Sequence, residues 1–380
     1  MKVSSYNSIT SVNRDSWNAC FTKVLENYDY LLATEKAGIP DFSWRYITVT
    51  DDAEKIIAAS FFFIAEYNLE TTLQGLAKKF VLGTRKLLPN FLKFKLACFG
   101  SPVSENCYFG FVEELNENEK LQATQLIFQE FERVAVKEKI KLLGIKDVPE
   151  ADKPLLDNVP AAKKYKSIIS MPSASLKIDF KNIDEYFAKL SHATRKDIRR
   201  KLKKLSELRI EKKTNIDDII DILHEMYLDT RSRSDWQFET LTKDYFRGIL
   251  SIMPHNSFCN VYYSTNDKRP LAANLFLFSN EILLDKYFCA RAEDARNYNI
   301  YFISWIENIK YCLENRIERY DAGQAGYENK IRLGCALSMN WLYFRHRNPA
   351  LNAMLRLAAP LLAEDLTLKP LEDKKTKDEK

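Results

Sequence analysis

The chain has 380 residues, of which 46% are hydrophobic and 12% aromatic, and its formal net charge is +5. This length is more than one hydrophobic core usually serves, so we expect two domains. No run of about 18 apolar residues occurs, and no apolar segment follows the first Met, so the sequence predicts neither a membrane-spanning helix nor a secretory signal and favours a cytoplasmic protein.

The cysteines, histidines and glycines that usually form metal and nucleotide sites are too few or wrongly spaced in this sequence. The seven cysteines are scattered without a CxxC pair, which is typical of reduced, buried thiols. The stretch HEMYL begins like a zinc protease motif at His224, but Leu228 stands where the second ligand would be. With ten glycines, the chain has no GxGxxG, P-loop or GxSxG pattern. We therefore expect no metal site and no Rossmann, P-loop or α/β-hydrolase site.

Residues 1–160 are expected to form the first domain. Its expected elements are a helix at 14–36, strands at 44–51 and 55–67, a helix at 117–137 and a strand at 141–148. Segment 73–103 mixes large apolar side chains with lysines and arginines. Three prolines between 147 and 160 mark the boundary to the second domain.

Residues 161–348 are expected to form the second domain, with elements in a similar order. These are a strand at 174–180, helices at 182–190 and 190–208, a strand at 208–214, helices at 215–233 and 241–253, strands at 258–265, 271–280 and 281–292, a helix at 298–315, a strand at 316–323, a helix at 327–334 and a strand at 339–347. The fold class is mixed α/β. Residues 349–370 are expected to form a helix that packs on the core or contacts a partner or membrane, and 371–380 a disordered tail.

The positive charge of the chain is concentrated in one segment. Residues 189–213 contain eleven Lys and Arg against three Asp and Glu, a net charge of +8 within a chain of +5. On a helical wheel Ile198 marks an apolar face, and the basic side chains lie opposite it. That basic face consists of Lys196, Arg199, Arg200 and Lys203. Ser191 is the expected N-cap of this helix.

Three interpretations of this basic helix remain open. It is a solvated surface helix, a site for an anionic ligand such as the phosphates of an acyl carrier or an aminoacyl-tRNA, or a contact with an anionic membrane surface. Asp197 is the only acid among its basic residues, and unpaired like charges favour an anionic partner. The lysine-rich segment 78–95 supports the membrane interpretation.

Two stretches resemble FemAB-like proteins, which belong to the GNAT superfamily of acyltransferases and are described as acting in peptidoglycan biosynthesis or recognition. The first is the basic stretch LSHATRKDIRRKLKK, and the second spans residues 287–334. The positions that match the family pattern in the second stretch are Tyr287, Tyr320, Asp321, Gly323, Tyr327, Lys330 and Gly334. The resemblance covers roughly residues 10–350.

The resemblance implies two tandem GNAT-like domains with an active groove where they meet. It also implies an N-acyltransferase or aminoacyltransferase that moves an acyl group from acyl-CoA, an acyl-carrier protein or aminoacyl-tRNA to an amine. No permanently bound cofactor and no DNA partner is expected, and a peripheral contact with the inner membrane face stays open. The glycine loop that binds the CoA pyrophosphate in single-domain GNAT enzymes has no counterpart in ARAEDARNYNIY, so the donor stays open as well.

The resemblance places the chemistry on particular residues. Asp321 is the candidate for steering or deprotonating the amine, with helix capping as its structural alternative. Tyr287 and Tyr327 are candidate proton donors, or else core aromatics. The candidate donor- and substrate-binding residues are Arg195, Lys196, Arg199, Arg200, Trp236, Arg291, Gly323 and Lys330. Lys330 is otherwise a surface lysine.

These assignments depend on one expectation about space. The basic row from Arg195 to Lys204 should line the mouth of a cleft between two similar lobes, close to Asp321 and Lys330. The alternative function is a non-catalytic protein that uses this row to bind RNA or an anionic membrane surface.

Overall fold

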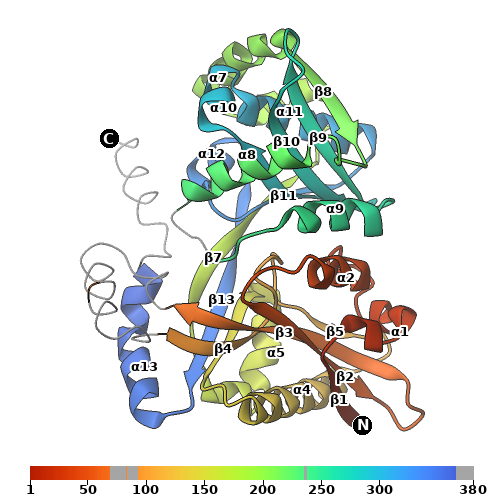
Figure 1. Ribbon diagram of the computed structural model, residues 1–380, viewed down its shortest axis with the longest axis vertical. Helices are drawn as coiled ribbons and strands as arrows, with labels where there is room; N and C mark the ends of the chain where they lie inside the picture. The colour runs from red at the N-terminus through yellow and green to blue at the C-terminus, as the bar shows by residue number, and fades with distance from the viewer. Residues whose placement is uncertain (69–82, 84–92, 235–237, 365–380) are drawn as a thin grey trace.

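The computed structural model of the protein describes residues 1–68, 83, 93–234 and 238–364. Figure 1 shows an upper and a lower lobe joined through long strands. The strands are β1 (Lys2–Tyr6), β2 (Phe42–Thr50), β3 (Ile56–Asn68), β4 (Lys93–Phe99), β5 (Phe109–Phe111), β6 (Leu142–Pro149), β7 (Lys166–Lys177), β8 (Leu208–Lys213), β9 (Ser257–Ser264), β10 (Pro270–Phe278), β11 (Ile282–Ala290), β12 (Arg319–Gly323) and β13 (Ala336–His346).

Helices cover this sheet in both lobes, so the class is mixed α/β as expected. The helices are α1 (Arg14–Ala19), α2 (Tyr28–Lys36), α4 (Glu117–Lys137), α5 (Lys153–Asn158), α6 (Ile183–Lys189), α7 (His192–Leu202), α8 (Ile220–Ser232), α9 (Lys243–Ile252), α10 (Ala292–Asn297), α11 (Ile300–Glu314), α12 (Tyr327–Arg332) and α13 (Pro349–Glu364). Within the described ranges, none of them combines the length and apolar character that a membrane span requires.

One sheet runs through both lobes in the order β1-β2-β3-β4-β6-β13-β7-β12-β11-β10-β9-β8, with β5 paired to β3. The last strand, β13, lies between β6 and β7 and is antiparallel to both. A strand from the end of the predicted second domain therefore completes the sheet of the first, and the division at residue 160 stays a prediction.

Each lobe contains one short parallel strand pair. Strands β4 and β6 pair over 96–99 and 142–145, and β11 and β12 pair over 282–284 and 319–321. The first pair is connected through α4 and the second through α10 and α11. Beyond these few residues, the described parts of the two strands in each pair are not paired with each other. This repeat explains why the two halves show a similar order of elements.

The amphipathic helices form where the sequence predicts them. The helix at 117–137 is α4, whose Phe131 packs edge-on against Phe62 of β3. The basic helix is α7, with Ser191 as its N-cap and Ile198 fully buried. The inward face of α7 is therefore confirmed, because Ile198 anchors it in the core of the second lobe.

Three sequence predictions differ from the structure or lie beyond it. The helix expected at 14–36 is interrupted, because Asn27 caps a new helix, α2. Strand β1 was not expected, since its polar sequence KVSSY gives little apolar signal at a sheet edge. Most of segment 73–103, the tail 371–380 and Trp236 lie outside the described residues.

Candidate active site

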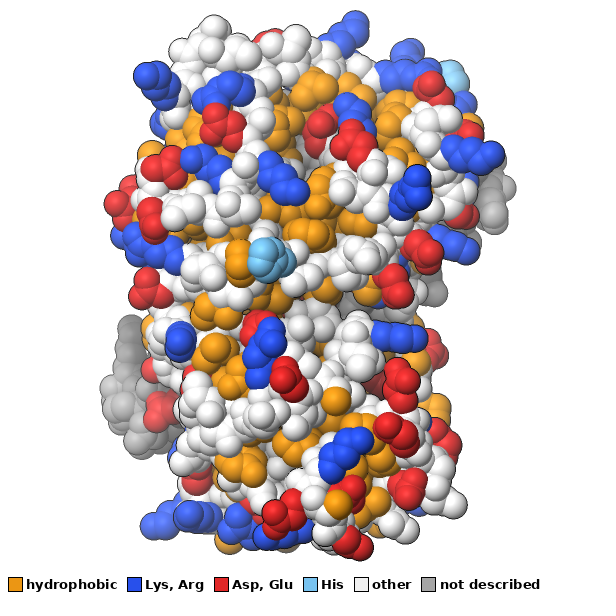
Figure 2. Space-filling view, turned by 90° about the vertical axis from the view of Figure 1, so that its right-hand side faces the viewer, with side chains coloured by type: hydrophobic (Ala, Val, Ile, Leu, Met, Phe, Trp, Pro, Cys, Tyr) orange, Lys and Arg blue, Asp and Glu red, His pale blue; other side chains and the backbone are white. Residues whose placement is uncertain are grey.

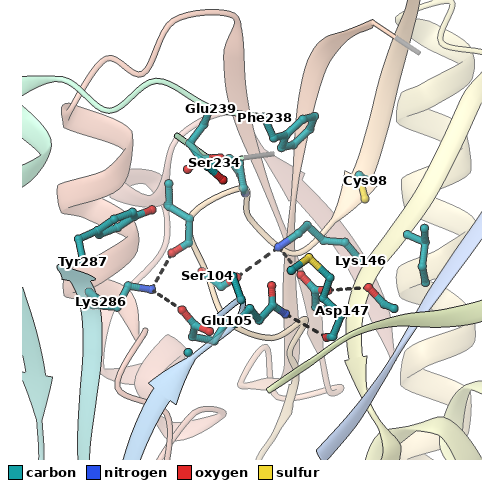
Figure 3. Close-up of a pocket in the computed structure, with 18 of the residues that line it drawn as sticks. Cys98, Ser104, Glu105, Lys146, Asp147, Ser234, Phe238, Glu239, Lys286 and Tyr287 are labelled. Atoms are coloured by element: carbon teal, nitrogen blue, oxygen red, sulfur yellow. Dashed lines mark hydrogen bonds and ion pairs between the residues drawn. The ribbon is translucent and has the colours of Figure 1, made fainter. Parts of the chain in front are cut away.

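A cavity of about 650 Å³, partly open to solvent, lies between the two lobes. It is lined by residues that follow β4, by residues of β6, β7 and β13, and by β11, β12 and Lys330 of α12. Figure 3 shows the charged side chains that converge at one end of it. A cavity of this size suits a small-molecule substrate, and its position between domains is a common place for one.

Strands β11 and β12 separate at this cavity. Their pairing ends at Leu284 and Asp321, so the edge of β11 that follows has no strand partner there. In the pairing with β10, Leu275 faces Tyr287 and Phe276 faces Asp285, which leaves Lys286 as an extra, bulged residue. The bulge re-aims side chains at the point where the strands diverge.

Lys286 forms a buried ion pair across the lobes. Its Nζ lies 2.6 Å from Glu26 Oε1, and both side chains are 1% exposed. It also donates to the Val103 carbonyl at 2.7 Å and lies 3.8 Å from Glu105 Oε1. Burial lowers the pKa of Lys286, but the charges of Glu26 and Glu105 outweigh burial and raise this pKa above its ordinary value.

In the first lobe, Lys146 directly follows the parallel-paired residues of β6. Its Nζ lies 2.5 Å from Asp147 and donates to the carbonyls of Ser101 and Ser104 at 3.0 and 3.2 Å. One lysine from each lobe thus holds the loop at 100–107, as Figure 3 shows. Residues 102–105 of this loop line the cavity.

Asp285 is the carboxylate best placed for proton transfer. Its Oδ2 accepts from the Tyr320 hydroxyl at 2.7 Å and from Asn274 Nδ2 at 3.2 Å. Its Oδ1 has no hydrogen bond within the described part of the chain, and the residue lines the cavity. Burial raises the pKa of Asp285 to about 6, against the opposing effect of these hydrogen bonds.

Lys330 is buried rather than a surface lysine. Its Nζ donates to the carbonyls of Gly323 and Gln324 at 3.1 and 2.9 Å, and burial lowers its pKa. Gly323 adopts a φ of +71°, a conformation that favours glycine. Both residues line the cavity, so Lys330 fixes the loop after β12 against it.

Tyr287 also lines the cavity, in an aromatic cluster with Tyr227 and Tyr245. Its hydroxyl has no hydrogen bond among the described residues, and Figure 3 shows this hydroxyl directed toward the cavity interior. Burial raises the pKa of Tyr287 well above its ordinary value. The hydroxyl therefore stays protonated at neutral pH.

The structure places other predicted catalytic residues away from the cavity wall. Asp321 forms an ion pair with Arg319 at 2.9 Å, and its neighbours Tyr320 and Ala322 line the cavity instead. The alternative role of Asp321 as a helix cap is wrong, because Gly326 begins α12 without a side-chain cap. The Tyr327 hydroxyl donates to the Pro172 carbonyl at 2.8 Å, outside the cavity lining.

The predicted basic residues are not brought to the cavity either. Arg195 donates to the Leu190 carbonyl at 2.6 Å, and Arg199 lies over the Phe187 ring. Arg291 pairs with Glu225 at 2.9 Å. None of these basic side chains lines the cavity, so the expectation that the row forms its mouth is wrong.

The charges of this row are also better paired than the sequence suggests. Asp197 contacts Arg200, Lys201 and, from α12, Arg332. Lys196 and Lys203 are exposed and have no ion pair within the described part of the chain. Elsewhere, the face in Figure 2 carries acidic and basic side chains interspersed rather than in one large patch.

Sequence reasoning missed Asp285 and Lys286, although a signal was present. Both stand side by side inside the apolar strand at 282–290, just as Lys146 and Asp147 do inside 142–149. Charged pairs within otherwise buried strands indicate polar networks. Glu26 carries no such signal in the sequence.

The fold and the separated strand pairs define a protein of two tandem GNAT-type domains. The structure of FemX is similar, with 13% identity, coverage of 94% of this chain and 100% of FemX, and a TM-score of 0.59. A tandem GNAT protein of clavulanic acid biosynthesis has 8% identity, 92% and 99% coverage and a TM-score of 0.55. A putative lysylphosphatidylglycerol synthetase domain from Agrobacterium fabrum has 10% identity, 92% and 96% coverage and a TM-score of 0.51.

A sequence model gives the family itself. The FemAB-like family model, described as peptidoglycan biosynthesis/recognition, matches residues 102–359, more than half of the chain. The chain therefore belongs to the FemAB-like family. Comparison with curated protein sequences gives no match.

Proposed function

We propose that this protein transfers an acyl or aminoacyl group from an activated carrier to an amine, inside the cavity where β11 and β12 separate. Membership of the FemAB-like family supports the reaction class. The single observation that carries the site is Asp285, a half-buried carboxylate that lines the cavity, with one unbonded oxygen and a pKa of about 6. A general base is most effective when its pKa lies near the working pH.

The reaction needs no covalent enzyme intermediate. Asp285 Oδ1 takes a proton from the amine as its nitrogen attacks the carbonyl carbon of the donor. The new C–N bond forms, and the bond from the carbonyl carbon to the sulfur or oxygen of the carrier breaks. Tyr287 gives its proton to the departing group, and proton exchange with solvent returns Asp285 and Tyr287 to their starting states, so one proton leaves the amine and one arrives on the released carrier.

The acyl carrier is a co-substrate in this proposal, and CoA, an acyl-carrier protein and tRNA remain its candidates. The amine acceptor is proposed to be a peptidoglycan precursor, in keeping with the family description. We propose a cytoplasmic location, where these carriers occur.

The test is turnover against a panel of acyl-CoA, acyl-carrier and aminoacyl-tRNA donors with amine acceptors. We expect Asp285→Asn to lower kcat/KM by about 10²- to 10⁴-fold, the usual contribution of a positioned acid or base. Asp321→Asn is the matched control, because Asp321 lies on the neighbouring strand β12, where the pairing with β11 ends, but outside the cavity lining. Equal losses in both variants would remove Asp285 from the mechanism, and no turnover with any donor would refute the transferase.

The basic helix supports a second candidate function, binding of an anionic surface or RNA. Its support is the exposure of Lys196, Arg199 and Lys203 on one side of α7. Binding to RNA or to vesicles with anionic lipid should weaken from 50 to 200 mM salt, and less so in a Lys196→Ala/Lys203→Ala variant, because fewer counterions are released. Salt-independent binding would exclude this candidate.

A further inference from the structure

The cavity changes character from one end to the other. The polar end holds Asp285, Lys286 and Lys330, described above. The opposite end rests on the sheet of the first lobe, on the face that α4 leaves uncovered, because Phe62 and Phe131 pack on the other side. One row of its floor crosses four neighbouring strands in register and consists of Phe63, Cys98, Gly144 and Phe344.

More aliphatic side chains extend this floor. Those that line the cavity are Leu96, Leu142, Ile168, Leu342 and, from α13, Leu355. Gly144 keeps the floor low, because a Cβ at this position would lie 3.0 Å from Cys98 Sγ. The described lining of this end of the cavity is therefore apolar.

The change from apolar to polar lining residues can be followed along single strands. On β6 the lining passes from Leu142 through Gly144 to Lys146, a path of about 13 Å at the usual rise per strand residue. On β7 the lining residues are Ile168, Ser170 and Met171. Both strands run from the apolar end toward the loop at 100–107 and the reactive end. A ligand that fills the cavity therefore has a polar head and an apolar tail.

The acidic lining residues all belong to the polar end. Asp147 forms an ion pair with Lys146 and Glu105 with Lys286. The charges of both lysines lower the pKa of Glu239 against the effect of burial, which raises it. Asp285 is next to Lys286 in sequence. Among the described lining residues, the apolar end thus offers no carboxylate to balance an ammonium group, which disfavours a charged aminoacyl group there.

We propose that the group transferred is a long-chain fatty acyl group, whose carbonyl lies beside Asp285 and whose hydrocarbon tail covers the floor formed by Cys98, Gly144 and Phe344. This inference rests on the proposed acyl transfer and names its substrate class. Apolar contact with the floor and with Leu355 binds the tail, and the polar end orients the reacting carbonyl.

Binding and turnover test this in parallel. Displacement of a dansyl-labelled fatty acid by palmitate measures the tail site without any reaction. Turnover of acetyl-, hexanoyl-, decanoyl- and palmitoyl-CoA, or of the matching acyl-carrier thioesters, measures chain-length preference. The blocking variant is Leu355→Trp, and the matched control is Met354→Trp, since Met354 is the adjacent residue on α13 and is 65% exposed.

We expect palmitate to bind, and its affinity to fall about tenfold or more in Leu355→Trp but not in Met354→Trp. Palmitoyl turnover should fall in the same variant, while hexanoyl turnover should not. Leu342→Trp, on the floor itself, should repeat this pattern, and thermal unfolding of each variant checks its folding.

Turnover without chain-length preference, or equal palmitate binding in the blocking and control variants, would overturn the fatty-acyl assignment and leave acyl transfer intact. Variant-sensitive palmitate binding with no turnover of any donor would keep the lipid site and refute the transferase instead.

Discussion

The two parallel strand pairs, β4/β6 and β11/β12, have the same geometry but treat buried charge differently. In the first pair Lys146 meets an acid at the next position, Asp147, which also accepts a hydrogen bond from Ser170 at 3.0 Å. In the second pair Lys286 turns away from its neighbour Asp285 and pairs with Glu26, 260 residues earlier in the chain. One pair satisfies its charges locally, and the other leaves a carboxylate oxygen without a partner.

This difference supports the proposal that the second lobe carries the reactive carboxylate. A buried carboxylate without a full set of partners is destabilised in its charged form, so it binds protons near neutral pH. The first lobe supplies structure instead, through the floor of the cavity and the loop at 100–107. In the proposed mechanism, the second lobe therefore carries the reactive corner and the first lobe a supporting corner.

The largest effect should come from breaking the ion pair between the lobes. Lys286→Met leaves Glu26 buried without a counter-charge, and we expect a loss of about 3–5 kcal/mol in the free energy of unfolding. Urea denaturation measures it. Lys146→Met should cost less, about 1–3 kcal/mol, because the Lys146 side chain is 22% exposed and Asp147 keeps its bond from Ser170.

The double variant Glu26→Gln/Lys286→Met provides the control for this prediction. It removes both charges, so most of the lost stability should return. Equal costs for Lys286→Met and Lys146→Met would show that the two corners do not differ in the way described here.

Asp285→Asn should give the next largest effect, and in the stabilising direction. The folded-state pKa of about 6 lies above the ordinary value of 3.8, so the wild type binds this proton more tightly when folded and loses stability as the pH rises from about 4 to 6. The neutral amide avoids this loss. We expect the variant to be about 1–3 kcal/mol more stable than the wild type at pH 7 to 8.

The pH dependence of that difference is its internal check. Below about pH 4 the carboxyl group is protonated in the folded and unfolded states alike, so the two proteins should unfold with nearly equal free energies. Thermal or urea unfolding across this pH range gives the curve. A variant less stable than the wild type at pH 7 would mean that burial does not destabilise the charged form of Asp285.

The local elements could be predicted from the sequence, because their signals are local. Helix α4 has its capping residue Asn116 and an apolar stripe, and α7 has Ser191 and Ile198. The candidate site could not, since it depends on pairing between distant segments. The bond from Glu26 to Lys286 and the insertion of β13 between β6 and β7 leave no periodic pattern.

Charge density likewise misdirected the choice of site. Basic residues on α7 are conspicuous in sequence, but Asp197 neutralises part of them and the remainder stay on the outside. The groups that line the cavity are single charges within apolar strands. Burial, rather than the number of charges, distinguishes the reactive end.

The smallest predicted effects concern this outer helix and sharpen the contrast with the buried pairs. Burial raises the pKa of Asp197, but hydrogen bonds from Arg200, Lys201 and Arg332 outweigh burial and lower this pKa below its ordinary value. The contribution of Asp197 to stability is therefore present above about pH 4 and is lost as the pH falls further. At pH 7 we expect Asp197→Asn to cost about 0.5–1 kcal/mol, since the side chain is 23% exposed and solvent screens its charge. Lys196→Ala, which breaks no ion pair, should stay within about 0.5 kcal/mol of the wild type. Urea titrations of both variants at pH 7 test this, and a cost for Asp197→Asn as large as that for Lys286→Met would mean that α7 is a structural centre of the protein rather than its periphery.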